Sequence, residues 1–267
     1  MKQVCLSLIE YKKQREIKVL FDEFQKYAVN NIISFFSNRI RRQFEIYFHE
    51  LIEWNKILNL IHYKNERDLI YRHFCDSLYS AKIIDSILTK QNMNSKNVKI
   101  ADLGTGSGMP GIPVKIALPD VVITLIESIT KKCKFLDNIN TKLRFDMEIL
   151  NKRAEEVGQM PLYKQKYDFV LSRAVSKFSA SLELSIPLLK VNGYFMVYKT
   201  KHSLLIPEEG LGSIKNALKH LGAKFEKVVF YHLPSKELDY CILVFKKHKD
   251  TPLQFPRKPG IPEKKPL

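Results

Sequence analysis

The residues with the clearest chemical potential form the glycine-rich stretch Asp102–Gly111, which ends an apolar run that begins at Val98. Glycines this close together let backbone N–H groups approach a ligand without interference from Cβ atoms. The residues after the turn, 112–118, are predicted to form a helix with proline in its first turn. A strand, a glycine turn and a helix in this order are typical of a corner that binds a nucleotide-type ligand.

Two ligands compete for this corner. Gly106, Gly108 and Gly111 fit the dinucleotide pattern G-x-G-x-x-G, which is a weak signal when it stands alone. The other alignment starts at Asp102, which ends the strand just before Gly104. A carboxylate there suits a positively charged ligand better than a pyrophosphate, and S-adenosylmethionine carries an ammonium and a sulfonium but no phosphate. We therefore favour S-adenosylmethionine over NAD, and a tight turn without a ligand is the third interpretation.

A second acidic residue, Glu127, ends the next apolar run, 121–126. An acid about 20 residues beyond the first glycine turn can accept hydrogen bonds from both ribose hydroxyls. Both candidate ligands contain a ribose, so Glu127 does not distinguish them. The alternative is a solvated carboxylate at the end of a strand.

Three further strand ends carry candidate site residues. The loop after a short strand at 147–150 holds Ala154 and Glu155, which we expect near an adenine ring because ligands bind at the carboxyl ends of strands in a doubly wound sheet. Arg173 falls just past the predicted fourth strand, and Lys199 ends the fifth. For Arg173 we favour an active-site group over a surface charge.

The residues present also limit the methyl acceptor. Methyl transfer depends mostly on orienting the nucleophile. An (Asn/Asp/Ser)-Pro-Pro-aromatic box, common in amino-group methyltransferases, is absent after the fourth strand, where Ser172-Arg-Ala-Val175 stands, and no cysteine nucleophile directly follows the fourth or fifth strand. A guanine N7 needs no general base, because its ring lone pair is already nucleophilic. We therefore expect Arg173 and Lys199 to position substrate and assign no certain catalytic residue.

The composition indicates a polyanionic partner. The 267 residues include 44 Lys and Arg against 28 Asp and Glu, a formal charge of +16, which is an argument about partners and solubility. The four cysteines lack metal-ligand spacing, and no apolar run approaches the ~18 residues of a membrane span. We expect a cytoplasmic protein without a metal site, either RNA-binding or simply basic and soluble.

The elements that must position these residues divide the chain into three parts. Residues 1–90 are predicted to be helical, with residues 1–40 as an extension, 91–248 form the α/β domain, and 249–267 are a basic, proline-rich tail that either docks on the body or follows an anionic partner. Within them we predict four helices: over Asn38–Asn59, from an N-cap at Asn65 to about Ile83, from Thr130 onward, and over Glu208–Leu221. We also predict an antiparallel pair of strands at 224–232 and 238–247. Trp54 and His73 could be functional, but we favour a packed tryptophan and a hydrogen-bonded histidine.

Short motifs along the chain resemble those of one family. They are Glu53-Trp-Asn-Lys56 with Asn59-Leu60, Arg72-His73 with Asp76-Ser77-Leu78, Asp102 to Pro113, Leu125-Ile-Glu-Ser128, Arg153-Ala-Glu155, Ser172-Arg-Ala-Val175, Tyr198-Lys199 and Phe255-Pro-Arg-Lys-Pro-Gly-Ile-Pro. This set, spread over about Gln43 to Leu267, resembles the glucose-inhibited division protein B family, also called RsmG, the small-subunit ribosomal RNA (guanine-N7) methyltransferases. The departures are Ile61 where the family often has Thr, Thr200 where it often has Gly, and about forty additional residues at the start.

The resemblance implies an α/β fold of the Rossmann-like class I S-adenosylmethionine-dependent methyltransferases, with a seven-stranded, mostly parallel sheet and an N-terminal helical extension. Its implied partner is 16S ribosomal RNA in or near the small ribosomal subunit, and we expect a monomer. The implied cofactor contacts are Gly104, Met109, Ala154, Glu155 and Arg173, with Glu127 at the ribose and Asp102, Gly106 and Gly108 in the turn; the candidates for RNA contact are Asn59, Arg153 and Lys199.

Three functions remain in competition. The first is N7 methylation of a guanosine in 16S ribosomal RNA. The second is methylation of another RNA or of a small molecule. The third is a non-catalytic RNA-binding assembly factor on a methyltransferase scaffold.

Overall fold

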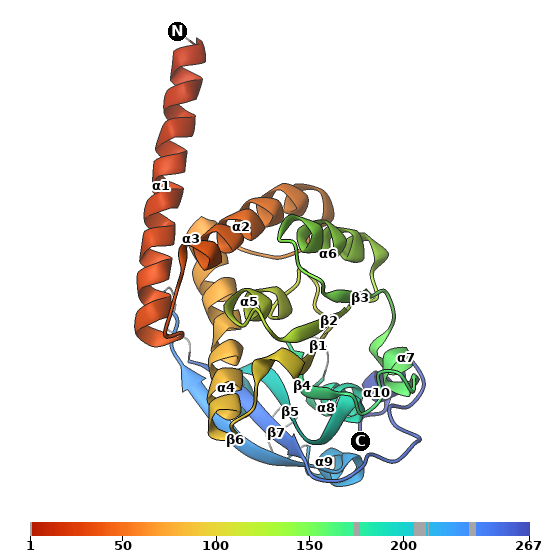
Figure 1. Cartoon of the computed structure of the whole chain (residues 1–267). Coiled ribbons are helices and arrows are strands. Elements are labelled where there is room, and N and C mark those ends of the chain that lie inside the picture. The colour runs from red at the N-terminus through yellow and green to blue at the C-terminus, as the bar shows by residue number, and fades with distance from the viewer. Residues whose placement is uncertain (1, 174–176, 206–211, 213, 235–238) are drawn as a thin grey trace.

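A central seven-stranded sheet organises the molecule (Figure 1). The computed structural model describes residues 2–173, 177–205, 212, 214–234 and 239–267. The strand order is β3-β2-β1-β4-β5-β7-β6; the pairs from β3 to β5 are parallel, and β7 is antiparallel to both of its neighbours. The predicted seven-stranded, mostly parallel sheet is therefore confirmed. The strands are β1 (Lys99–Leu103), β2 (Val122–Ile126), β3 (Glu148–Leu150), β4 (Tyr167–Ser172), β5 (Leu189–Thr200), β6 (Ala223–Tyr231) and β7 (Tyr240–Lys247).

Helices cover both faces of the sheet. Successive strand residues point to opposite faces, so Ile100 joins a core that includes side chains of α1, α2, α4, α5 and α6, whereas Ala101 joins a second core with α8 and α9. The α-helices are α1 (Lys2–Asn31), α2 (Asn38–Leu58), α3 (Glu66–Leu69), α4 (Asp76–Lys90), α5 (Gly111–Ala117), α6 (Thr130–Lys142), α7 (Ala154–Gln159), α8 (Phe178–Ser185), α9 (Lys215–Leu221) and α10 (Ile261–Lys264). Short 3₁₀ turns lie at Ser95–Asn97, Ile186–Leu188 and His202–Leu205.

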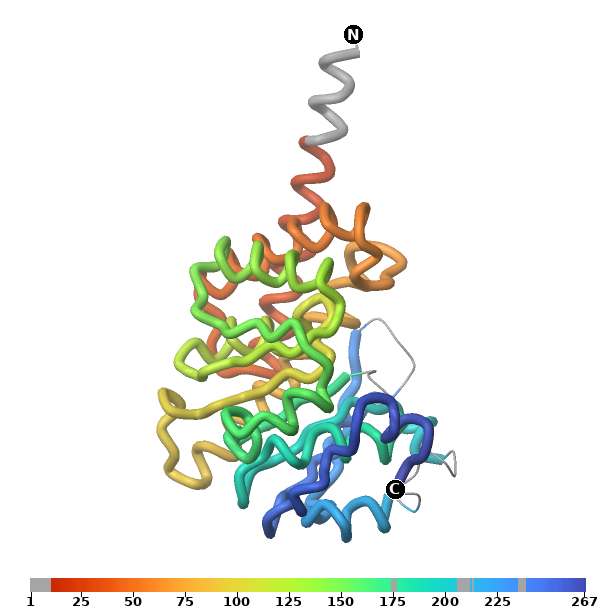
Figure 2. The backbone as a smooth tube through the Cα atoms, turned by 90° about the vertical axis from the view of Figure 1, so that its right-hand side faces the viewer, coloured from red at the N-terminus to blue at the C-terminus, as the bar shows by residue number. Residues whose placement is uncertain are grey.

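The N-terminal helices pack through aromatic rings. Phe24 of α1 lies edge-on to Phe44 of α2, with ring centroids 5.1 Å apart, and both side chains are fully buried. Figures 1 and 2 show α1 projecting beyond the rest of the body. Its packing begins at Ile17, and Tyr11 is 64% exposed. The first described side chains of the extension therefore lie outside the core.

The segment between α2 and α4 departs from the single helix that we predicted. Asn65 caps α3 as expected, since its side chain accepts a hydrogen bond from the backbone N–H of Asp68 at 2.9 Å. The chain then forms a π-helical turn, Ile70–Cys75, before α4. Apolar spacing does not separate an α-helix from one with a local π turn, and such turns are frequent at functional sites.

The C-terminal part contains one confirmed pair and one shorter helix. β6 and β7 form the predicted antiparallel pair, and their connection at 235–238 lies outside the described residues. The helix predicted from Glu208 begins at Lys215, because Gly212 and Ile214 lie in turns; residues 206–211 and 213 are not among those described. It ends, as predicted, at Gly222, which has a left-handed φ of 78°.

The tail docks on the body. Arg257 donates to the fully buried carboxylate of Glu183 on α8, with Nη2 at 2.6 Å and Nε at 2.8 Å from its oxygens. Lys164 donates to the backbone oxygens of Leu253 and Phe255, both at 2.9 Å. Of the two predictions for this segment, docking is the one that the structure shows.

Candidate active site

Three candidate site residues directly follow the carboxyl ends of neighbouring strands. Leu103 at the end of β1 is in register with Ile126 of β2 and with Ser172 of β4. The next residue along each of these strands is Gly104, Glu127 or Arg173. The parallel pairing therefore brings a glycine turn, a carboxylate and a guanidinium to one carboxyl edge, as the sequence predicted.

The glycine turn has a backbone that glycine favours. Gly104, Gly106 and Gly108 have φ values of 64°, 58° and 91°, in the left-handed region that other residues rarely adopt. A Cβ atom on Gly108 would lie 2.2 Å from Cδ1 of Ile112, so this glycine is needed for close packing. A Cβ on Gly106 would make only ordinary van der Waals contacts, the nearest with the Gly104 backbone oxygen at 3.9 Å.

The buried side chain of Asp102 stabilises this turn through hydrogen bonds. Its Oδ2 accepts hydrogen bonds from the Thr105 hydroxyl at 2.6 Å and from the Gly111 backbone N–H at 2.7 Å. The side chain is fully buried, and burial raises the pKa of its carboxyl group to about 6. Its second oxygen, Oδ1, has no hydrogen-bond partner in the described part of the chain. This orphaned acceptor fits a cationic ligand, although the carboxylate also has a structural role that the sequence did not indicate.

Glu127 joins the end of β2 to the same turn. Its Oε2 accepts a hydrogen bond from the Gly106 N–H at 3.0 Å, and its Oε1 accepts one from the Ile129 N–H at 2.8 Å. The residue is only 5% exposed. Each carboxylate oxygen has lone pairs beyond those used, so the group can still accept hydrogen bonds from a diol.

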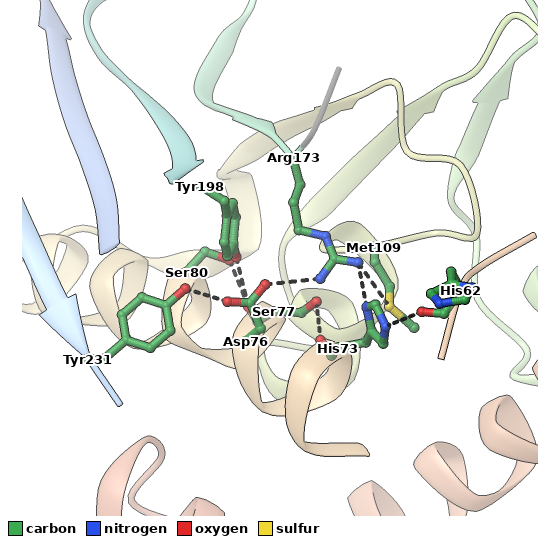
Figure 3. A network of polar contacts seen from close by, with 9 residues as sticks. All are labelled: His62, His73, Asp76, Ser77, Ser80, Met109, Arg173, Tyr198 and Tyr231. Carbon is green, nitrogen blue, oxygen red and sulfur yellow. Dashed lines mark hydrogen bonds and ion pairs between the residues drawn. The ribbon is translucent and has the colours of Figure 1, made fainter. Parts of the chain in front are cut away.

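Arg173 is held in a polar network across the carboxyl edge (Figure 3). Its guanidinium lies 3.0 Å from Oδ2 of Asp76, 3.0 Å from Nδ1 of His73 and 3.7 Å from the sulfur of Met109. A guanidinium has only donors, so Nδ1 of His73 must accept and its proton resides on Nε2. That Nε2–H then donates to the backbone oxygen of His62 at 3.1 Å. The histidine is thus fixed as one neutral tautomer.

Asp76, the first residue of α4, connects this network to β6. It accepts a hydrogen bond from the Tyr231 hydroxyl. Burial raises the pKa of the Asp76 carboxyl group, and the nearby Arg173 cation opposes that effect. Next to it, the hydroxyl of Tyr198 on β5 donates to the Ser77 backbone oxygen at 3.2 Å. The π turn and the start of α4 are therefore bound to three strands through polar side chains.

The remaining predicted residues lie around this centre. Ala154 and Glu155 open α7 after β3, and Oε1 of Glu155 accepts a hydrogen bond from the Gly260 N–H of the tail at 2.9 Å. Lys199, on β5, lies over the ring of Phe178 at 4.8 Å from its centroid. The other two RNA candidates are exposed: Arg153 precedes α7, and Asn59 caps the end of α2 with a left-handed φ of 47°.

The sequence analysis did not assign His73, Asp76 and Tyr231 to the site. His73 was interpreted as a hydrogen-bonded histidine without a functional role; the structure confirms the hydrogen bonding and shows that one of its partners is Arg173. The signal that was available is the pair His73 and Asp76 at a spacing of three residues, within one of the family-like motifs. Tyr231 comes from β6, far along the chain, and no local pattern marks it.

Other site types receive no support from the described residues. Within them no three His, Cys, Asp or Glu side chains are grouped so as to hold a metal ion. No helix of this part is long and apolar enough to cross a membrane.

Comparison with known proteins agrees with the resemblance. Residues 40–237 match the family GidB, described as rRNA small subunit methyltransferase G. Ribosomal RNA small subunit methyltransferase G of Bacillus subtilis (strain 168) is 36% identical over 232 residues, covering 86% of this chain and 92% of that protein. The protein of the same name from Alkaliphilus oremlandii is 38% identical over 219 residues, covering 81% and 86%.

Solved structures share the fold at low identity. A proposed class I S-adenosylmethionine-dependent methyltransferase from Listeria monocytogenes superposes with a TM-score of 0.56 at 16% identity, covering 79% of this chain and 71% of that one. A proposed sarcosine dimethylglycine methyltransferase from Galdieria sulphuraria gives 0.51 at 13% identity, covering 76% and 98%. The fold is that of the class I methyltransferases, and the chain belongs to the GidB family, rRNA small subunit methyltransferase G.

Proposed function

We propose that this protein transfers a methyl group from S-adenosylmethionine to N7 of a guanosine in 16S ribosomal RNA. The observation that carries the proposal is the meeting of Gly104, Glu127 and Arg173 at one carboxyl edge, directly after three residues paired in register. Family membership supports the reaction class and the RNA substrate. The finer assignment to N7 rests on the family resemblance and on the absence of the motifs that other acceptor atoms require.

The turn and its neighbours suit the proposed cofactor. Glu127 would accept hydrogen bonds from the ribose hydroxyls, since its carboxylate is already fixed to the Gly106 N–H. The orphaned Oδ1 of Asp102 supplies negative charge in a buried place, where electrostatic interactions are strong. Ala154 and Glu155, beside the neighbouring strand end, would line the adenine site. S-adenosylmethionine itself supplies an electrophilic methyl group.

The protein's own contribution to the reaction is orientation. N7 of guanine is a hydrogen-bond acceptor with an available lone pair, so no side chain has to remove a proton before transfer. Aligning such a nucleophile with the methyl carbon lowers the barrier mainly through positioning. Arg173 is suited to this because Asp76 and His73 hold its guanidinium on two sides. Lys199, Asn59 and Arg153 are the proposed contacts to RNA.

The test is methyl transfer from labelled S-adenosylmethionine to purified small subunits, large subunits and naked 16S RNA, followed by mapping of N7-methylguanosine. We expect label at one guanosine of the small-subunit RNA. Label only in another RNA or in small molecules would establish the second function. Donor binding without transfer, or no donor binding in calorimetry, would leave an assembly factor and would overturn the proposal. Titration with NAD in parallel tests the dinucleotide alternative.

A further inference from the structure

A basic groove lies between the start of α2 and the end of α6, away from the candidate active site. The groove encloses about 380 Å³, and its lining contains four cations and no acid among the described residues. The cations are Arg39, Arg42, Lys142 and Arg144. A second groove of about 440 Å³ shares Arg42 and Lys142 and extends the surface along α2 to His49. Its lining also contains Glu45, which is paired with Arg41, and Glu50, which is paired with Lys142. We call this surface the α2–α6 groove.

Three of its four cations have no carboxylate partner. No acidic side chain of the described residues lies within ion-pair distance of Arg39, Arg42 or Arg144, and all three residues are exposed. Lys142 is paired with Glu50. By contrast, the neighbouring Arg41 forms ion pairs with Asp22 and Glu45, so its charge is neutralised within the protein. The groove therefore presents positive charge that the protein itself does not neutralise.

The arginines at the start of α2 oppose helix stability. The amino end of a helix carries a partial positive charge, so cations there are unfavourable. The first turn of α2 contains no acidic residue to compensate. Arg144 also sits at a left-handed φ of 54°, which other residue types such as Gly and Asn adopt more easily. Folding therefore does not account for positive charge at these positions.

The groove is remote from the methyl-transfer edge. α6 starts at Thr130, just after the carboxyl end of β2, and ends at Lys142 beside the groove. Thirteen helical residues span about 20 Å at 1.5 Å per residue. α2 runs antiparallel to α6, since Trp54 contacts Phe135 while Glu50 contacts Lys142. Its far end, Asn59, therefore lies toward the active edge.

We propose that the α2–α6 groove binds the phosphate backbone of ribosomal RNA at a second place, about 20 Å along α6 from the carboxyl edge of the sheet. This inference rests on the proposed function and deepens it. A partner that bridges such a distance must be large and ordered, as folded RNA in a ribosomal subunit is, whereas a small molecule or an isolated nucleoside would not reach the groove. Phosphate contacts fix register and orientation and carry no sequence information, so the groove would orient the substrate while the active edge selects the base.

The test replaces the three unpaired arginines together, as Arg39→Gln, Arg42→Gln and Arg144→Asn. Glutamine matches arginine in helix propensity, and asparagine tolerates the left-handed backbone at position 144. The matched control, Lys96→Gln, Lys219→Gln and Lys224→Gln, removes the same charge from exposed residues outside the groove. Binding to small subunits is measured over a range of salt concentrations, together with S-adenosylmethionine affinity and melting temperature.

A plot of log K for binding against log salt concentration has a negative slope. We expect the groove variant to make this slope less negative by about 2 to 3, roughly one per lost phosphate contact, while the control variant changes it little. Its donor affinity should equal that of wild type, and its melting temperature should not fall. Equal slopes for the groove and control variants would overturn the inference, because net charge alone would then explain binding. Wild-type protein that methylates no ribosomal RNA would instead overturn the proposed function.

Discussion

Arg173, which follows β4, lies 3.0 Å from the carboxylate of Asp76, the first residue of α4. The two residues are 97 positions apart, and their side chains are 17% and 7% exposed. The ion pair links the end of a central strand to the helical region that precedes the sheet in sequence. Because the guanidinium also contacts His73 and Met109, the pair sets the position of the charge at the active edge.

Asp76→Asn should lower both stability and turnover. Removing one member of a buried pair leaves the other charge uncompensated, which costs about 3 to 5 kcal/mol when burial is complete. Since Arg173 keeps some solvent contact, we expect a loss of roughly 2 kcal/mol in urea denaturation. Tyr231→Phe, which removes only the hydrogen bond to Asp76, should cost about 1 kcal/mol. Equal effects of the two variants would show that the ion pair adds nothing.

His73 should act as a positioning residue through its Nδ1 atom. His73→Leu removes the acceptor for Arg173, so we expect kcat for methyl transfer to fall by about tenfold, the equivalent of one hydrogen bond of about 1.4 kcal/mol. His73→Asn offers an amide oxygen near the position of Nδ1 and should recover most of that loss. Donor affinity, measured by calorimetry, should change little in either variant. If asparagine and leucine gave the same kcat, a hydrogen bond to Arg173 would not be the reason for this histidine.

The strand ends could be predicted from the sequence because each is a local signal. Apolar runs that stop at Asp102, Glu127 and Arg173 mark the carboxyl edge of a parallel sheet, and the structure places all three there. The cap at Asn65 was likewise predictable, because capping involves residues three apart.

The network behind Arg173 could not be predicted in the same way. Its members come from the π turn, the start of α4, the residue after β4, and β6. Tyr231 is 155 residues from the Asp76 carboxylate that it contacts. The sequence predicted a hydrogen-bonded His73, and the structure shows it buried and hydrogen-bonded, but only the tertiary fold shows that Arg173 is a partner. The same limit applies to Glu155, whose bond to Gly260 spans 105 residues.

Gly104→Asp should weaken donor binding more than it weakens the fold. Gly104 is exposed at a φ of 64°, a conformation that aspartate tolerates better than most residues, while the added side chain would crowd the turn. Gly108→Ala is the structural contrast, because its Cβ would lie 2.2 Å from Ile112 and should lower the melting temperature. Calorimetry with S-adenosylmethionine and thermal melting measure the two effects. Unchanged donor affinity in Gly104→Asp would count against the turn as the cofactor site.

Docking of the tail should depend on Arg257. Its guanidinium is the described partner of the fully buried Glu183 carboxylate, so Arg257→Gln leaves that charge with weaker neutral hydrogen bonds. We expect a loss of roughly 2 to 3 kcal/mol in free energy of unfolding and faster proteolysis within residues 249–267. Arg153→Gln, an exposed arginine before α7, is the control and should change neither quantity. Resistance of the tail to protease in Arg257→Gln would mean that its apolar contacts suffice.

Asp102 should make stability depend on pH in a direction opposite to that of a salt-bridged acid. Burial raises the pKa of this carboxyl group from 3.8 to about 6, so between these values the folded state holds a proton that the unfolded state has released. Stability relative to Asp102→Asn should therefore fall as pH rises from about 4 and level off above about 6, by at most about 3 kcal/mol for a shift of this size. The variant cannot ionise at this position and serves as the baseline in urea titrations at each pH. A difference between the two proteins that stayed constant over this range, or that grew in favour of wild type as pH rose, would contradict a buried carboxyl group with one oxygen unpartnered.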